Sequence, residues 1–230
     1  MIKLNGFMPA WGLSDPSPYV TKARILFKMA GVSYESAMAD LESVSKHKAP
    51  YIVLENGDVI QDSTFIRKYL ESQGANFNAD YEPKELAFGF ALERLCENHL
   101  NWILTHDRWL NDENFTKGPR MFFMNAPEAM RDNIIKEVRG RVSAGQLSHG
   151  ISRHTEDEIF ELGKMDVDAI SDAMGDNNFI LGANLCGYDA SVYATLAGIS
   201  TPYFECRTGE YVRQNPRLMA YIERMNNKYL

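Results

Sequence analysis

Hydrophobic and polar positions alternate in two different ways along this chain, and the change between them divides it into two halves. Residues 1–73 contain short strand-like segments separated by helix-like ones, whereas the residues from about 83 onward read as one helix after another. The stretch between them, Gly74 to Pro83 (GANFNADYEP), is rich in Gly, Asn, Asp and Pro, which is typical of a linker. We therefore predict one domain over residues 1–74 and a second over residues 84–230.

The pattern of residues in the first half predicts a small α/β domain. Strands are expected over residues 1–7, 32–39, 51–54 and 59–60, with a two-residue turn at Asn56-Gly57 joining the last two. Ser17 is a good N-cap and Pro18 suits the first position of a helix that ends at Gly31. Ser63 is expected to cap a second helix, which ends before Gly74. The resulting order, βαβ followed by ββα, is that of a thioredoxin-like domain.

The pattern of residues in the second half predicts a bundle made only of helices. Apolar residues recur at helical spacing over residues 83–110, 127–147, 155–174, 188–200 and 216–228. A helical bundle is the simplest arrangement of these segments.

Composition and charge narrow the range of functions. The 230 residues are 45% hydrophobic and 24% charged, as in ordinary globular proteins, and the formal net charge is −7. An acidic chain without a basic run repels phosphate backbones and anionic lipids, so we expect no nucleic-acid or membrane-surface partner. No stretch approaches the roughly 20 apolar residues of a membrane span, and the first residues lack the apolar core of a signal peptide.

The three cysteines, Cys96, Cys186 and Cys206, are scattered along the chain. They provide neither a disulfide framework nor a zinc-binding spacing, which favours a reducing, cytoplasmic location. The first half contains no cysteine and the chain has no CxxC motif, so a dithiol oxidoreductase is excluded.

Four motifs together resemble the glutathione transferase superfamily over nearly the whole chain. They are SPYVTKARILFKMAGVSYE from Ser17, Lys48-Ala49-Pro50 before a strand, Gln61-Asp62-Ser63 at a helix start, and Phe179-Ile180-Leu181-Gly182 followed by Asp189. Within the superfamily, FMPAWGLSDPSPY and GYDASVY are most similar to the metaxin-related, failed-axon-connections-like group. One residue departs from the pattern: Cys186 stands where a Ser or Thr usually caps the helix, which weakens that cap by under about 1 kcal/mol.

The resemblance implies a site for glutathione as co-substrate. Pro50 would be cis, so that the Ala49 backbone pairs with the cysteinyl amide, and Lys48 would meet the glycyl carboxylate. Asp62 and Ser63 would hold the γ-glutamyl ammonium and carboxylate. Each residue also has an ordinary structural explanation: a trans proline at a strand start, a surface lysine, and a capped helix.

Ser17 is the candidate that activates the glutathione thiol. At the N-terminus of the first helix its hydroxyl can donate to the thiolate and favour the charged form. The alternative is that Ser17 is only the N-cap of that helix. Tyr19 and Trp11 are rivals in the same segment, and Trp11 is expected to be a packing residue.

A second, apolar substrate would bind between the two halves. Tyr19, Trp102, His106 and Trp109 are its candidate contacts, although such residues at helical spacing more often belong to a core. His99 and His106 are seven residues apart, too far along a helix for one ion to bridge, so no metal site is expected.

These observations predict a glutathione-transferase-like enzyme. It would conjugate glutathione to a small hydrophobic electrophile, as in detoxification, or use glutathione to reduce a peroxide or disulfide; the superfamily further implies a homodimer. The alternative is a binding or interaction module that kept the fold without turnover. Survival of the pocket around Pro50, Asp62 and Ser63 discriminates between them.

Overall fold

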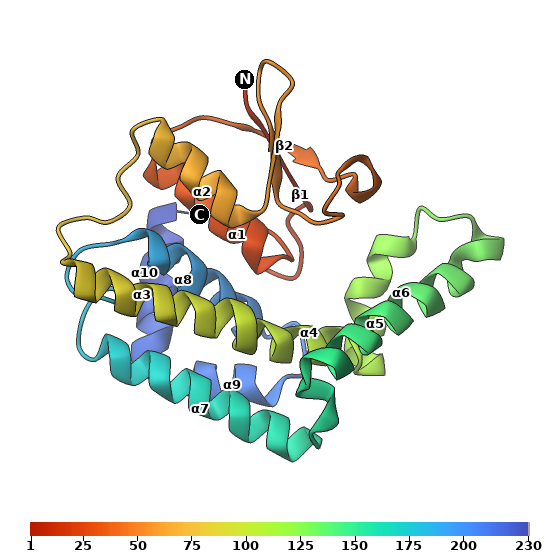
Figure 1. Ribbon diagram of the computed structural model, residues 1–230. Coiled ribbons are helices and arrows are strands. Elements are labelled where there is room, and N and C mark those ends of the chain that lie inside the picture. Colours follow the sequence, from red (N-terminus) through yellow and green to blue (C-terminus); the bar gives the residue numbers. More distant parts are fainter. Residues whose placement is uncertain (230) are drawn as a thin grey trace.

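The computed structural model describes residues 1–229 and places a small sheet with two helices beside a larger group of helices (Figure 1). The strands are β1 (Lys3–Gly6), β2 (Glu35–Met38), β3 (Tyr51–Val53) and β4 (Val59–Gln61). They form one mixed sheet in the order β2-β1-β3-β4, in which β1 pairs with β2 in parallel and with β3 antiparallel. With α1 (Pro18–Met29) and α2 (Ser63–Ser72), this is the predicted βαβ–ββα order.

Helix α1 begins and ends where its sequence signals predicted. The Ser17 side chain accepts a hydrogen bond from the Val20 backbone N–H, and Pro18 is the first helical residue. Val20, Ala23 and Phe27 are fully buried on one face. Gly31 follows the helix with φ +66°, a conformation that glycine adopts without steric cost. The amphipathic pattern therefore predicted both the extent of α1 and the face that it buries.

The hairpin between β3 and β4 has a longer loop than predicted. The Leu54 N–H donates to the Asp58 carbonyl and the Gly57 N–H donates to the Leu54 carbonyl, which leaves three loop residues rather than two. The Asn56 side chain accepts from the Asp58 N–H, so Asn56 closes a local side-chain turn, and Gly57 takes the left-handed position. A turn of this kind followed by a left-handed glycine is the common three-residue hairpin loop.

The cap of α2 is Asp62 rather than Ser63. The Asp62 Oδ1 atom accepts from the Thr64 N–H at 2.9 Å, and Ser63 is already the first helical residue. A carboxylate accepts this bond better than a hydroxyl does, because the exposed N–H groups at a helix start favour negative charge.

All five predicted helical segments of the second half are present. They correspond to α3 (Pro83–Leu95) with α4 (Asn101–Trp109), α6 (Glu128–His149), α7 (Glu156–Met174), α8 (Gly187–Ser200) and α10 (Pro216–Tyr229). A π-helical turn at Cys96–Leu100 connects α3 to α4. Two short helices, α5 (Asp112–Lys117) and α9 (Arg207–Gln214), were not predicted. Figure 1 shows α6 extending away from the other helices.

Helix α8 lies at the centre of the molecule and is buried along nearly its whole length. It packs against α1 of the first half and against α3, α4, α9 and α10 of the second. Asp189 is the only charged residue of α8, which allows the helix to be buried on every side. One continuous core therefore runs from the sheet into the helices.

The start of α8 is held by the fully buried Asp189 carboxylate. Its Oδ2 accepts from the Cys186 N–H at 2.9 Å, and its Oδ1 accepts from the Ile180 N–H and the Tyr221 hydroxyl, both at 3.0 Å. Cys186 occupies the N-cap of a complete capping box, so the thiol does replace the usual hydroxyl there.

We predict that Asp189→Asn lowers the free energy of unfolding by about 2 to 4 kcal/mol, because the new amide turns N–H donors toward the Cys186 N–H inside the core. Urea denaturation followed by circular dichroism measures the change. The matched control is Asp157→Asn, also in the first turn of a helix but in an exposed ion pair with Arg207, which is expected to cost under about 1 kcal/mol. Equal losses for the two variants would contradict the role of Asp189.

Candidate functional site

A polar cavity of about 480 Å³ lies where the first half meets α3 and α4. Lys48, Ala49, Pro50, Asp62 and Ser63, the five residues predicted to bind one ligand, all line it. The Ala49–Pro50 peptide bond is cis, as predicted. The remaining lining residues are Tyr19, Thr64, Arg94, Glu97, Asn98, Asn101, Trp102 and Thr105.

Two of these groups have hydrogen-bonding capacity to spare. Within residues 1–229 the buried Ser63 hydroxyl makes no hydrogen bond, and the exposed Lys48 ammonium makes no ion pair. The Asp62 N–H donates to the Pro50 carbonyl at 3.0 Å, which ties the start of α2 to the cis proline. The cavity therefore offers a carboxylate, a hydroxyl, an ammonium and the helix N-terminus within one wall, a set suited to a zwitterionic ligand.

An apolar cavity of about 530 Å³ adjoins the polar one. Ser17, Trp109, Phe122 and Phe123 are among the residues that line it. The two cavities share Tyr19, Asn101 and Thr105 as lining residues. A polar ligand and an apolar one can thus be held side by side, with Tyr19 at the boundary.

The loop that carries Ser17 is held by the buried Asp15 carboxylate. It accepts from the Phe7 N–H at 2.9 Å and from the Ser17 N–H at 3.0 Å, and it pairs with Arg24 at 3.3 Å. Burial raises the pKa of Asp15 to about 7, while these three donors act in the opposite direction. The Ser17 hydroxyl accepts from the Val20 N–H, and its own proton has no acceptor within the described part of the chain.

The Tyr19 hydroxyl, by contrast, is already committed. It donates to the Glu97 carbonyl at 3.0 Å and accepts from the Asn101 amide at 3.3 Å. Burial, followed by the nearby negative charge of Glu97, raises the pKa of Tyr19. Tyr19 can donate to another group only by breaking its bond to Glu97, which Ser17 does not have to do.

Arg108 fixes the other side of the same loop. Its buried guanidinium donates to the carbonyls of Pro16 and Gly198 and lies over the Trp11 ring, with 5.2 Å from its central carbon to the ring centroid. Burial lowers the pKa of Arg108 to about 10. Trp11 is 8% exposed and packs edge-on against Phe204, and it also lines the apolar cavity.

The three candidates on α4 do not share one wall. Trp102 lines the polar cavity and stacks on His149 at 4.2 Å between ring centroids, and Trp109 lines the apolar cavity. His106 lines neither cavity, which corrects the expectation drawn from helical spacing. Its ring turns toward Asp107 and Glu156 at the start of α7.

A buried cluster of charges beside the polar cavity was not predicted. Lys22 on α1 contacts Glu93 at 2.8 Å and Glu97 at 2.6 Å, and Arg94 contacts the same two carboxylates. The Ser191 hydroxyl on α8 donates to Glu97 at 2.6 Å. The i, i+4 spacing of Glu93 and Glu97 around Arg94 was the available signal, but nothing in the sequence assigned Lys22 to them. Arg94 brings a cation to the cavity wall.

His99, two residues after Glu97 in the π-helical turn, pairs with Asp166 on α7. The distance from Nδ1 to the carboxylate oxygen is 2.5 Å, and this hydrogen bond raises the pKa of His99.

Comparisons with known proteins agree with this architecture. A model of the glutathione S-transferase N-terminal domain matches residues 18–114, and a model of the glutathione S-transferase C-terminal domain matches residues 163–225. An isoprene-epoxide–glutathione S-transferase of Rhodococcus sp. (strain AD45) is 34% identical over 236 residues, covering 100% of this chain and 99% of that protein.

Two further matches are more distant. The Failed axon connections protein of Drosophila melanogaster is 26% identical over 230 residues, covering 94% of this chain and 55% of that protein. A glutathione S-transferase of Ceriporiopsis subvermispora, solved in complex with glutathione, superposes with a TM-score of 0.69 at 14% identity, covering 100% and 98% of the two chains. The predicted fold is thereby confirmed.

The His99–Asp166 pair makes stability depend on pH. Because the pKa of His99 is higher in the folded protein, its stabilising contribution is complete below the unfolded pKa of about 6.5 and is lost as pH rises through the folded pKa. We therefore expect the free energy of unfolding to fall between pH 6 and 9 by about 1 kcal/mol more in the wild type than in His99→Gln. Urea titrations at each pH measure this, with the exposed His154→Gln as control; parallel curves for wild type and His99→Gln would contradict it.

Proposed function

Because the chain belongs to the glutathione S-transferase family, we propose that it binds glutathione as co-substrate and transfers it to a small apolar electrophile. The observation that carries the proposal is the polar cavity itself. All five residues predicted from the glutathione motifs line it, and it shares a wall with an apolar cavity next to Ser17. We further propose that the chain divides functionally into residues 1–74 for glutathione and 84–230 for the helical part.

Each end of glutathione has a partner in this proposal. The Ser63 hydroxyl and N–H bind the γ-glutamyl carboxylate at the start of α2, where the helix dipole favours an anion, and Asp62 binds the neighbouring ammonium. Lys48 binds the glycyl carboxylate, and the Ala49 backbone pairs with the cysteinyl amide. Arg94 adds a second cation beside the glutamyl end, held in place by its bonds to Glu93 and Glu97.

Ser17 is the proposed activating residue. Its free hydroxyl proton and the N-terminus of α1 both stabilise negative charge, so they favour the thiolate over the thiol. The thiolate then attacks the electrophile and a sulfur–carbon bond forms. If the electrophile is an epoxide, as in the name of the Rhodococcus relative, the ring carbon–oxygen bond breaks and the oxygen takes a proton from water. Glutathione-dependent reduction of a peroxide or disulfide would use the same thiolate.

Tyr19 and Trp109 are proposed to contact the second substrate, since both line the apolar cavity. Trp102 would contact the glutathione side instead. A cavity of about 530 Å³ with Phe122 and Phe123 in its wall fits a compact hydrophobic molecule. A role in detoxification of such electrophiles follows from this proposal.

The alternative is a module that uses the fold for binding alone. The similarity to Failed axon connections is the observation that favours it. The glutathione titration described below decides between the two, because an interaction module has no need of a working glutathione site.

A homodimer and a cytoplasmic location complete the proposal. Phe65 on α2 and Phe88 and Phe90 on α3 are about half exposed, and such aromatic surface is typical of interfaces. All three cysteines are free thiols, which supports a reducing compartment. No helix among the described residues is long and apolar enough to cross a bilayer.

We predict that glutathione binds and that the double variant Asp62→Ala, Ser63→Ala weakens binding by about 2 to 4 kcal/mol, because charged and hydroxyl partners of a bound zwitterion are lost. Titration calorimetry measures the affinity. The control pair Asp58→Ala, Ser72→Ala removes an exposed carboxylate and hydroxyl nearby and should leave binding unchanged. The absence of heat with millimolar glutathione and wild-type protein would reject the glutathione site and favour the interaction module.

We predict that Ser17→Ala raises the pKa of bound glutathione and slows conjugation at neutral pH while changing affinity little, because the hydroxyl stabilises the thiolate more than the thiol. Ultraviolet absorbance of the thiolate against pH measures the pKa. Losing the N-cap alone costs about 0.5 to 2 kcal/mol of stability. The matched variant is therefore Ser17→Asn, whose side-chain oxygen keeps the cap while the hydroxyl is lost. If neither variant moves the titration curve, Ser17 is only a cap, and Tyr19→Phe is the next test.

A further inference from the structure

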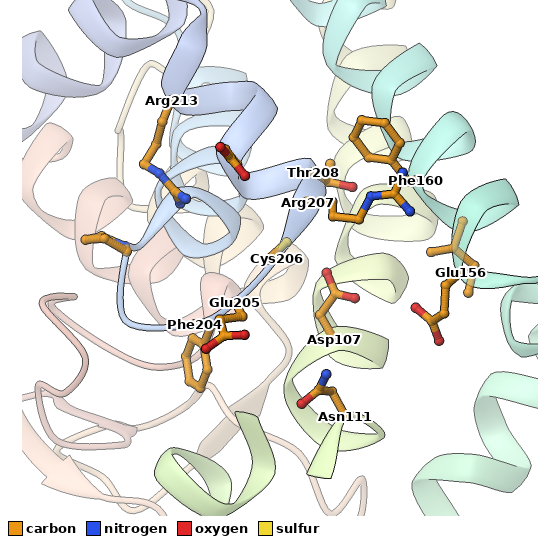
Figure 2. A pocket seen from close by; sticks show the side chains of 13 residues that line it. Asp107, Asn111, Glu156, Phe160, Phe204, Glu205, Cys206, Arg207, Thr208 and Arg213 are labelled. Carbon is orange, nitrogen blue, oxygen red and sulfur yellow. The ribbon is translucent and has the colours of Figure 1, made fainter. Parts of the chain in front are cut away.

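A third cavity, of about 500 Å³, opens on α4, α7 and α9 and is separate from the two described above (Figure 2). Its lining includes Asp107 from α4 and Glu156, the first residue of α7. Figure 2 shows the two carboxylates facing each other from these helices. His106 precedes Asp107 on α4, and its imidazole lies 3.8 Å from Glu156. Glu156 is about fifty residues away in the sequence from the adjacent His106 and Asp107.

The spacing of the donor atoms does not suit hydrogen bonds. His106 Nδ1 is 3.7 Å from Asp107, and His106 Nε2 is 3.8 Å from Glu156. Both distances exceed the usual limit of about 3.2 Å for a nitrogen–oxygen hydrogen bond. His106 is only 8% exposed, and its buried Nδ1 makes no hydrogen bond. A buried imidazole nitrogen without a partner is costly and points to a ligand.

The same spacing does suit a common metal ion. One ligand atom from each of the three residues lies within 4.8 Å of the other two. Two donors bound to one ion at about 2.1 Å are about 3 to 4 Å apart. An ion on His106 Nδ1, the nitrogen without a hydrogen bond, lies on the Asp107 side of the ring. The exposed Glu156 side chain, whose carboxylate is 3.8 Å from Nε2, turns toward Nδ1 to complete the set.

The cations that line this cavity are engaged elsewhere. Arg207 pairs with Asp157 at 2.6 Å, and Arg213 donates to the Ser200 carbonyl at 3.1 Å. Within residues 1–229, His106 is the only basic group within 4 Å of either the Asp107 or the Glu156 carboxylate. Two carboxylates facing one imidazole leave net negative charge for a cation to neutralise.

We propose that His106, Asp107 and Glu156 bind a divalent cation. One imidazole nitrogen and two carboxylates favour the borderline ions of the first transition row, such as Zn²⁺, Mn²⁺ or Co²⁺, over Ca²⁺, which prefers six or more oxygens. The ion would join the end of α4 to the start of α7. It would therefore stabilise the helical half rather than take part in the proposed thiol chemistry, because His106 lines neither of the other two cavities.

The test is a titration of the purified full-length protein with Co²⁺, whose visible absorption reports coordination. We expect a saturable spectrum at one equivalent, displaced by Zn²⁺, and a rise in the thermal midpoint with either ion. Glu156→Gln should weaken Co²⁺ binding at least about tenfold and remove the thermal shift. The Glu156 side chain is 75% exposed, so this variant keeps the fold, whereas His106→Gln changes a nearly buried group and serves as the second variant.

The matched control is His154→Gln. His154 lies 3.8 Å from Glu158, the same distance as in the proposed site, but it has no third ligand among the described residues. Its loss should leave the Co²⁺ spectrum unchanged. A wild-type protein with no saturable spectrum would overturn the proposal, and so would a spectrum that persists with unchanged affinity in Glu156→Gln.

Discussion

The buried charges of Lys22, Glu93, Arg94 and Glu97 are the constraint on which the rest of this structure depends. Lys22 is 1% exposed, and a lysine is tolerated at such a depth only with carboxylates against it. Glu93 and Glu97 provide them from α3 and the π-helical turn, so these ion pairs tie α1 of the first half to the second. Because removing any one charge leaves the others uncompensated, the cluster acts as a unit.

Both of the cavities that Tyr19 lines follow from that geometry. Tyr19 is three residues before Lys22 on α1, and its hydroxyl donates to the Glu97 backbone of the same cluster. The cluster therefore places Tyr19 at the boundary between the polar and the apolar cavity. Arg94 extends the cluster to the wall of the polar one. A charge network that serves to dock two halves thus also shapes the space between them.

Local sequence signals predicted the elements and their order well, and the errors have physical causes. Capping and periodicity located α1 and α8 because both depend on residues close together in the chain. The hairpin loop differs by one residue, since Asn56-Gly57 is compatible with either a two-residue or a three-residue loop and the register of β3 with β4 decides between them. Helices α5 and α9 have six and eight residues, too few to show a helical period.

The sequence by itself determined the fold class and five of the residues that line the polar cavity, because Lys48-Ala49-Pro50 and Asp62-Ser63 belong to motifs that are contiguous in the chain. The tertiary structure alone decided which distant groups meet. Helical periodicity indicates that His106 and Lys22 lie on helix faces that pack against other helices. It does not indicate which side chains those other helices place opposite them. Glu156 faces His106, and Glu93 and Glu97 face Lys22, only because helices far apart in the sequence pack at one particular offset. Pairing of charges inside a protein is a property of that packing, and short-range patterns carry no information about it.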